Sequence, residues 1–587
     1  MKKVLSLVLV FCLMASVSAF AGSEVLQGYV SAWDNYGLDK DPITLTIGCG
    51  SQDLPASYEN NIQIELIKQA TGVQLEFVGY DAEKFAVLSA GGDLPDIFSL
   101  ENATVVNDLI DSGKVLDLSD YLDEYGKNIT QVHGDYGIPM AKSVYGNGEA
   151  VYFVPSNVSW LGDTKIAAAQ ISFNYFPRWD LYTAVGAPEI IDEDGFSEDL
   201  LLEAFAEMQA YAREMTGADN IYALSGWVDW GTAWAALLPY CVAIPAQLNM
   251  WTDQTTGLIN NVDIYGDPNS HYYNALRFYN KAWRMGILDP EIFTLTQSQY
   301  DAKVKMGQVI VTNASWFDAG MMDESVKAVF GDDTNFYVLK GMPYFYTLLT
   351  QSNPSGFGIF ASDFISAKCE YPERAVALVD YLRSDEFTRA SACGLQGIHW
   401  DYNENGTPVF IGEALEHYNK GTMSEYWDVA NGNYKYFPNT KLSMASKVCA
   451  DGYPSDFTTS ADYIMVKYEN NESVQNYLDF YESDARYPGE LYLEWIEEGL
   501  AVTDAAWQAK TQYKPGSSDE MNSLLAKCDA YYIDNHARVV FANTEEEAEA
   551  IIAEMCEYEQ TIGSGLLLED QLAREAASLK TAEDMGL

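Results

Sequence analysis

The sequence predicts an α/β fold built on a parallel sheet, and the order of its first five elements carries this prediction. Two runs, Ile43–Ile47 and Val73–Val78, alternate apolar and polar residues as strands do. Between them, Asn61–Thr71 has apolar residues at helical spacing and stops at a glycine. A second helix over Asp81–Ala90 precedes a third strand at Ile97-Phe98. This alternation favours parallel strands joined by right-handed crossovers.

The turn into the third strand places polar residues at one edge of this sheet. Gly91 and Gly92 end the helix, Pro95 turns the chain toward an extended conformation, and Asp93 and Asp96 are expected to serve the turn. In an open α/β sheet, residues just beyond the carboxyl ends of the strands line the ligand crevice. We expect these crevice residues to be Ser51, Gln52, Asp53, Ser99, Glu101 and Asn102.

The later elements continue the pattern and end in helices, without an internal repeat. Strands are predicted in Ala150–Pro155, at the start of Ile171–Tyr182 and in Val304–Trp316, and much helix follows Gly489. The predicted helices are Val105–Ser112, Ser119–Gly126, Glu198–Met215, Tyr272–Met285, Tyr371–Arg383 and Asn543–Glu559.

The composition excludes some classes of function. Acidic residues number 86 against 34 basic ones, a formal net charge of −52. Such a chain repels phosphate backbones, so we expect no nucleic-acid partner. A solvated acidic surface explains the charge, and a Ca²⁺-dependent protein is the alternative. Because 48% of its 587 residues are hydrophobic, the chain can bury large cores.

The N-terminus has the parts of a secretory signal peptide. Lys2-Lys3 precede an apolar stretch, Val4–Met14, which is too short to span a membrane. Ser18–Ala21 then predicts cleavage after Ala21, so we expect an exported protein at the outer face of the cell membrane or in the medium. Cys12 lies inside the apolar stretch and is a poor lipidation site. The other seven of the eight cysteines cannot all pair, and we expect most to be buried thiols, with one disulfide as the alternative.

Enzyme and metal motifs are scarce. The sequence has no P-loop, dinucleotide fingerprint, H-E-x-x-H motif or G-x-S-x-G elbow, and its five histidines lack ligand spacing. A glycosidase would need only two carboxylates, and the sequence singles out no such pair. Asp401–Gly406 imitates half of a Ca²⁺ loop, but Gly412 stands where the bidentate glutamate belongs. We therefore predict turns there and at Asp192–Gly195, with no metal, no cofactor and no enzymatic activity.

Five stretches occur in a recognisable order: Gly92–Asp96, Tyr175–Asp180, Gly286–Asp289, Met306–Trp316 and Pro372–Ser384. Together they resemble the family 1 extracellular solute-binding proteins, the sugar-capturing subunits of ABC importers, a group that includes the maltose-binding protein. The larger Gram-positive members are the most similar. The resemblance implies a two-lobed, periplasmic-binding-protein-like α/β fold of type II, with hinge crossings and an extended helical C-terminal region. The cysteine that anchors most Gram-positive members at the cleavage site is missing here.

The resemblance also implies domain boundaries. After the signal peptide (1–21) and a short linker with a docked end (22–40), lobe 1 would comprise 41–155 and 313–355. Lobe 2 would comprise 156–312 and 356–500, and a helical extension, 501–587, would pack on the lobes. Pro155, Asn313 and Ser355–Gly358 would be the crossings, since loop residues and glycines absorb the dihedral changes of a hinge.

Aromatic residues are abundant, with 13 Trp, 40 Tyr and 25 Phe, and flat rings suit the apolar C–H faces of sugars. Packing in the core is the alternative for each ring. Tryptophans at predicted loops and crossings are the ligand candidates: Trp160, Trp227, Trp230, Trp316 and Trp400. Carried over by position, the expected hydroxyl-binding residues are Ser51, Gln52, Asp53, Glu101, Asn102 and Asp318.

The function favoured by these expectations is capture of a carbohydrate, most simply an oligosaccharide, between two lobes. A monomer would deliver it to the membrane permease of an ABC importer. A secreted carbohydrate-active enzyme, or the same fold binding a peptide or a uronate, is the alternative.

Overall fold

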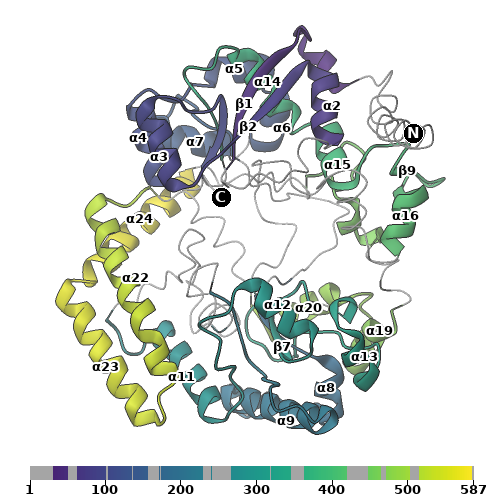
Figure 1. The fold of residues 1–587 in the computed structure, drawn as a ribbon, viewed down its shortest axis with the longest axis vertical. Helices are drawn as coiled ribbons and strands as arrows, with labels where there is room; N and C mark the ends of the chain where they lie inside the picture. The colour runs from purple at the N-terminus through teal and green to yellow at the C-terminus, as the bar shows by residue number, and fades with distance from the viewer. Residues whose placement is uncertain are drawn as a thin grey trace, which may run out of the picture. The chain divides into compact units, whose positions relative to one another are not determined.

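The computed structural model describes residues 31–49, 62–100, 103–134, 137–155, 171, 173–228, 240, 266–317, 319–345, 362–419, 447–463, 468, 471–502 and 515–584. The chain divides into two compact units. Unit 1 comprises Met1–Ile166 and Pro354–Ser460, and unit 2 comprises Ala167–Asn353 and Ala461–Leu587. Both contain strands and helices, and long helices end the chain (Figure 1). This confirms the predicted α/β class with a helical C-terminal region.

Unit 1 is built on a four-stranded sheet in the order β2-β1-β3-β8. As predicted, β1 (Ile43–Cys49) pairs in parallel with β2 (Val73–Gly79) and with β3 (Ile97–Leu100). β8 (Ser362–Ile365) adds an antiparallel edge next to β3. The buried ring of Phe98 on β3 stacks on the ring of Phe364 on β8, so strands distant in sequence share one apolar layer.

Helices and one hairpin complete unit 1. The helices are α2 (Ile62–Thr71), α3 (Ala82–Gly91), α4 (Ala103–Asp111), α5 (Ser119–Tyr125), α6 (Lys127–His133), α7 (Gly137–Tyr145), α14 (Pro372–Tyr381), α15 (Asp385–Cys393) and α16 (Gly412–Asn419), with the 3-10 turn η5 (Phe457–Thr459). β9 (Trp400–Tyr402) and β10 (Pro408–Phe410) pair as a hairpin. α14 contacts both α5 and α6, which follow one another in the chain, and α15 contacts α2.

The turn between α3 and β3 forms as the sequence predicts. Gly92 caps α3 with a φ of 73°, a left-handed conformation that glycine adopts without strain. The carboxylate of Asp96 accepts hydrogen bonds from the amide and the hydroxyl of Thr46, both at 2.8 Å. Asp96 therefore ties the turn to β1, which confirms its expected structural role.

The segment before β1 is docked on unit 1. The 3-10 helix η1 (Ala32–Tyr36) buries Trp33 completely, with its ring 6.1 Å from that of Tyr381 on α14. The hydroxyl of Tyr36 donates to Asp380 of the same helix at 2.5 Å. The predicted linker over 22–40 therefore has a docked end, as expected, because an indole that packs in the core holds η1 in place.

Unit 2 is mostly helical around a two-stranded antiparallel sheet. β4 (Phe173–Pro177) pairs with β7 (Val311–Ala314), and a short hairpin joins β5 (Ile191–Asp192) to β6 (Gly195–Phe196). The surrounding elements are α8 (Trp179–Ala184), α9 (Glu198–Thr216), α11 (His271–Arg284), α12 (Gln297–Lys305), η3 (Ala319–Met321), α13 (Glu324–Phe330), α19 (Glu472–Phe480) and α20 (Pro488–Glu497).

Three long helices end the chain and belong to unit 2. They are α22 (Asp519–Val540), α23 (Glu545–Ile562) and α24 (Gly565–Asp584). Thr544 caps α23, as its spacing to Glu547 predicts. The amide of Asn280 on α11 donates to carbonyl oxygens at the end of α22, and α11 packs against both α22 and α23. These helices contribute to the core of unit 2 instead of lying outside it.

Two predicted lobe boundaries are wrong. The segment 313–353, expected in lobe 1, belongs to unit 2, because β7 pairs with β4. The segment 356–460, expected in lobe 2, belongs to unit 1, because β8 pairs with β3. Asn313 is therefore a buried strand residue and no crossing. The chain leaves unit 2 close to the predicted crossing at 355–358 and returns after Ser460, which the sequence does not suggest.

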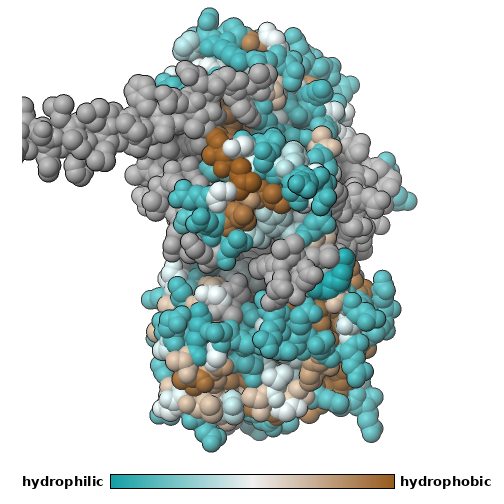
Figure 2. All heavy atoms as spheres, turned by 90° about the vertical axis from the view of Figure 1, so that its right-hand side faces the viewer, coloured by the Kyte–Doolittle hydropathy of each residue, from teal (hydrophilic) through white to brown (hydrophobic). Residues whose placement is uncertain are grey.

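The described surface is largely hydrophilic on one face. Figure 2 shows hydrophilic residues over most of this face, with a hydrophobic group in its upper half and smaller ones near its lower end. Among the helices that the structure describes, none combines the length and the apolar character that a bilayer crossing requires.

Candidate functional site

The described ends of β1 and β3 lie at one edge of the sheet of unit 1. Ile47 pairs with Ile97 and Gly48 with Phe98, so both carboxyl ends point the same way. Residues predicted to bind hydroxyls at this edge lie outside the described ranges, so their role stays a prediction: Ser51, Gln52, Asp53, Glu101 and Asn102.

Ser99, the last polar residue of β3, belongs to a buried network of charges. Its hydroxyl donates to Asp363 on β8 at 2.7 Å, and Arg383 donates to the other carboxylate oxygen of Asp363 at 2.8 Å. The side chains of Asp363 and Arg383 are 1% and 0% exposed. Arg383 also donates to the carbonyl oxygen of Pro155 at 3.2 Å. Ser99 therefore fixes the end of β3 through its hydroxyl, and its predicted place among the crevice residues stays a prediction.

Unit 2 presents an aromatic surface where β7 ends. Trp316 follows β7 by two residues and is 39% exposed. The ring of Phe173, at the start of β4, meets the ring of Trp316 edge-on, with 5.5 Å between the ring centroids. The ring centroid of Phe317 lies 5.8 Å from that of Trp316. Because Phe173 pairs with Ala314, the register of β4 and β7 positions the rings. We call Trp316, Phe173, Phe317 and the underlying Trp227 the aromatic platform.

Trp227 supports this platform from below. Its ring is 0% exposed and lies 6.3 Å from the ring of Trp316 and 4.9 Å from that of Tyr300 on α12. The prediction that Trp227 contacts a ligand directly is therefore wrong. The stretch around it is no free loop, since Val228 donates its amide hydrogen to the carbonyl oxygen of Leu295 at 2.9 Å. The neighbouring candidates Trp230 and Asp318, and also Trp160, lie outside the described residues.

The platform suits a neutral ring with apolar C–H faces. A partly exposed indole that rests on other rings loses little conformational freedom when a ligand stacks on it. Trp316 has this arrangement, because three aromatic neighbours restrict its side chain while more than a third of its surface stays in solvent. Its predicted place in the site stays a proposal that this geometry supports.

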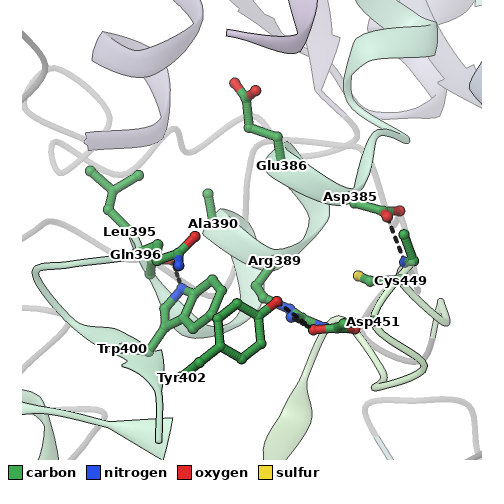
Figure 3. Close-up of a pocket in the computed structure, with 12 residues that line it drawn as sticks. Asp385, Glu386, Arg389, Ala390, Leu395, Gln396, Trp400, Tyr402, Cys449 and Asp451 are labelled. Atoms are coloured by element: carbon green, nitrogen blue, oxygen red, sulfur yellow. Dashed lines mark hydrogen bonds and ion pairs between the residues drawn. The ribbon is translucent and has the colours of Figure 1, made fainter. Parts of the chain in front are cut away.

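Unit 1 contains a pocket of about 230 Å³ between α15 and the β9–β10 hairpin (Figure 3). Trp400 and Tyr402 of β9 line one side, with ring centroids 5.4 Å apart, and Arg389 and Asp451 line another. The predicted candidate Trp400 lines this pocket although it is only 5% exposed, and its indole nitrogen donates to the carbonyl oxygen of Gly394 at 2.6 Å.

Hydrogen bonds and charge hold the polar wall of this pocket in place. Arg389 is 5% exposed and binds Asp451 with both terminal nitrogens, and its guanidinium lies 5.2 Å from the ring centroid of Trp400. The hydroxyl of Tyr402 donates to Asp451 at 2.7 Å. Burial alone would raise the pKa of Asp451, but hydrogen bonds from Arg389 and Tyr402 bring it below its usual value. Burial and the adjacent carboxylate raise the pKa of Tyr402 to about 12.

Of the residues that line this pocket, sequence reasoning named only Trp400 as a ligand candidate, and the residues it missed include Arg389, Tyr402 and Asp451. One signal for Tyr402 was present, since Trp400 and Tyr402 are two positions apart and share one face of a strand. No local signal could have joined Arg389 to Asp451, because 62 positions separate them. Phe173 of the platform was missed for the same reason, since it meets Trp316 through strand pairing.

The turns predicted in place of Ca²⁺ loops are confirmed. Asn403–Gly406 connects β9 to β10, with the amide of Gly406 donating to the carbonyl oxygen of Asn403. Asp192–Gly195 closes the hairpin of β5 and β6. No group of three His, Cys, Asp or Glu within the described ranges could hold a metal ion.

The buried histidines and thiols have structural surroundings. Burial lowers the pKa of His399 and of His536 to about 4, so both are neutral near pH 7. The Nδ1 atom of His399 accepts the amide hydrogen of Leu395 at 2.9 Å. Within the described residues the free thiols are Cys369, Cys393, Cys449, Cys528 and Cys556, all but the first buried, as expected.

No protein-family model matches this sequence, and a search of the curated proteins finds no relative. Solved structures do match across most of the chain. The alginate-binding protein AlgQ2 has 15% sequence identity and a TM-score of 0.54, over 92% of this chain and 99% of its own. The FusA substrate-binding protein of an S. pneumoniae ABC transporter, in complex with fructo-nystose, has 14% identity and a TM-score of 0.54, over 92% and 100%.

A third similar structure is an HMO-binding solute-binding protein associated with an ABC transporter, from Bifidobacterium longum infantis. Its identity is 12% and its TM-score 0.53, over 93% of this chain and 99% of its own. At such identities the similarity establishes the fold. The chain therefore has the two-lobed α/β fold found in solute-binding proteins of ABC transporters, as the ordered stretches in its sequence predict.

Proposed function

We propose that this protein is the solute-binding component of an ABC importer and that it captures an oligosaccharide. The observation that carries the proposal is Trp316, a partly exposed indole held on a buried aromatic base at the end of β7. Flat aromatic rings bind the C–H faces of sugars, and surrounding polar groups orient the hydroxyls. The shared fold supports this proposal, because the descriptions of the three similar proteins named above each mention a carbohydrate ligand.

The proposed mechanism is a shift between populations of conformations. A ligand that contacts both units stabilises the arrangement in which both contacts form, because only its differential affinity can move the equilibrium. The liganded protein, exported after cleavage behind Ala21 and acting as a monomer, then docks on a membrane permease. The polar residues proposed to complete the site are Ser51, Gln52, Asp53, Glu101, Asn102 and Asp318, together with Trp160 and Trp230.

The proposal is tested by thermal unfolding of the purified protein with a panel of oligosaccharides and peptides. A ligand that binds the native state raises the unfolding temperature, so a sugar of the panel should stabilise the protein and the peptides should not. Recovery of the sugar unchanged after prolonged incubation separates a binding protein from a secreted carbohydrate-active enzyme. Stabilisation by peptides alone, or cleavage of the sugar, would contradict the proposal.

Trp316 provides the residue-level test. We expect Trp316→Ala to weaken sugar binding at least tenfold, about 1.4 kcal/mol, while the ligand-free protein keeps its fold. Tyr558→Ala is a matched control, because Tyr558 is also 39% exposed and in unit 2 but lies on α23, stacked on Tyr531 at 3.9 Å. Isothermal titration of both variants gives the comparison, and equal affinities would remove Trp316 from the site.

A further inference from the structure

The two cations described at the pocket of unit 1 are already paired with carboxylates. Arg389 binds Asp451 with both terminal nitrogens and donates to the carbonyl oxygens of Tyr453 and Pro454. Lys447, beside the pocket, binds Asp385 of its lining. Both cations that the structure describes here therefore neutralise carboxylates and leave no positive charge for an incoming anion.

The remaining lining favours a hydroxylated and uncharged ring. Asp385 keeps 36% of its side chain in solvent, and its carboxylate can accept hydrogen bonds from hydroxyl groups. Trp400 and Tyr402 supply aromatic surface, and Gln396 adds an amide that can donate and accept (Figure 3). A volume of about 230 Å³ lies below the range of roughly 300–1,000 Å³ typical of pockets for drug-sized ligands. The pocket is therefore large enough for a single sugar ring but too small for a whole oligosaccharide.

We propose that this pocket is a subsite for one uncharged sugar residue and that it rejects uronic acids. The inference rests on the proposed function and adds the class of sugar. A uronate differs from its neutral counterpart by a carboxylate in place of the hydroxymethyl group. In this pocket that carboxylate would lie near Asp385 and Asp451. Among the described residues around the pocket no cation is free to bind it, and like charges at close range repel.

Asp451 is the residue that determines this selectivity. Its carboxylate receives both terminal nitrogens of Arg389, the hydroxyl of Tyr402 and the amide of Tyr453 at 3.0 Å. Asp451→Asn removes the charge but keeps an oxygen for the amide of Tyr453. Arg389 stays near Trp400, because the two carbonyl oxygens still hold it, and its positive charge becomes available to a uronate.

The experiment uses pairs of tetrasaccharides that differ only at C6. The probes are mannotetraose against tetramannuronate and galactotetraose against tetragalacturonate, titrated by calorimetry into the full-length mature protein at low salt. We expect a neutral member to bind at least 100-fold more tightly than its uronate, and Asp451→Asn to reduce this ratio at least tenfold. Glu404→Gln is the matched control, because it removes the same charge from an exposed position in the β9–β10 turn and should leave the ratio unchanged.

Each other outcome has a distinct meaning. If a uronate binds as tightly as its neutral partner, the inference is overturned and the proposed function stands. If a broader panel of neutral and acidic sugars shows no binding, the proposed function fails. Should Asp451→Asn unfold, Tyr402→Ala replaces it, since Tyr402 is 40% exposed at the rim. That variant should weaken neutral-sugar binding at least tenfold, and unchanged affinity would overturn the subsite.

Discussion

Some carboxylates buried in the two units have different kinds of partner. In unit 1, Asp363 faces Arg383, and the partly buried Asp451 faces Arg389. In unit 2, Glu559 is 0% exposed, and uncharged groups bind it: the amide of Gly266 at 2.5 Å and the hydroxyl of Tyr273 at 3.1 Å. The difference shows that an uncharged hydrogen-bond donor and a cation do not stabilise the charge of a buried carboxylate equally.

The pKa of Glu559 expresses this difference. Burial raises it to about 7, and hydrogen bonds from Tyr532, Gly266 and Tyr273 offset only part of that shift. Asp451, which has a guanidinium beside it, instead has a pKa below its usual value in spite of burial. The carboxylate of Asp451 therefore stays charged near neutral pH, whereas Glu559 loses its proton near neutral pH at a cost in stability.

The largest effect is expected from breaking the buried pair of unit 1. Asp363→Ala removes the carboxylate that balances the buried charge of Arg383 and accepts the hydroxyl of Ser99, so we expect a loss of about 3–5 kcal/mol of unfolding free energy. Hydrogen-exchange mass spectrometry should report this loss in β3 and β8 of unit 1.

The control for this variant is another Asp–Arg pair in the same unit. Asp39 binds Arg374 at 2.8 Å, but its side chain is 69% exposed. Asp39→Ala should cost at most about 1 kcal/mol, because solvent screens an exposed charge. Equal losses for the two variants would mean that burial does not decide the strength of these pairs.

A pH-dependent effect is expected in unit 2. The folded pKa of Glu559, about 7, lies above the unfolded value near 4.5, so the folded state holds a proton that the unfolded state has lost between these values. The unfolding free energy of unit 2 should therefore fall as pH rises from about 4.5 to 7, by on the order of 3 kcal/mol, and this contribution should level off above pH 7.

Glu559→Gln isolates this contribution. Glutamine cannot ionise, its oxygen can accept the amide hydrogen of Gly266, and its nitrogen can donate to the hydroxyl of Tyr273. The variant should lose the pH dependence and exceed the wild type in stability above pH 7, measured as exchange protection of α23. If the unfolding free energy of the variant depends on pH as strongly as that of the wild type, groups other than Glu559 cause the dependence.

The smallest effect is expected for an exposed pair of unit 2. Arg538 on α22 binds Glu554 on α23 at 3.0 Å, with side chains 45% and 55% exposed. Arg538→Ala should change the unfolding free energy by less than about 1 kcal/mol, and 0.5 M salt should reduce the difference further. A loss as large as that of Asp363→Ala would contradict the distinction between buried and exposed charge.

The sequence predicted what periodicity and capping encode locally. Short stretches that need no distant partner predict the strands β1, β2 and β3 and the turn at Gly92. Five such stretches, taken in order, also predict the fold of solute-binding proteins. The place of Trp316 after an apolar strand marked it as a ligand candidate, and this role stays a prediction that its exposed ring supports. The prediction for Trp227 failed because burial depends on neighbours such as Tyr300 that local sequence does not reveal.

By itself, the sequence determined the fold class, the local elements and the acidic surface, because each arises from residue types and spacings within a few turns of chain. Only the tertiary structure decided which unit each segment joins, since strand pairs such as β3 with β8 connect residues more than 250 positions apart. It also decided the partners of buried charges. Arg389 meets Asp451, and Glu559 meets Gly266 and Tyr273, and these contacts set the pKa of Asp451 and of Glu559.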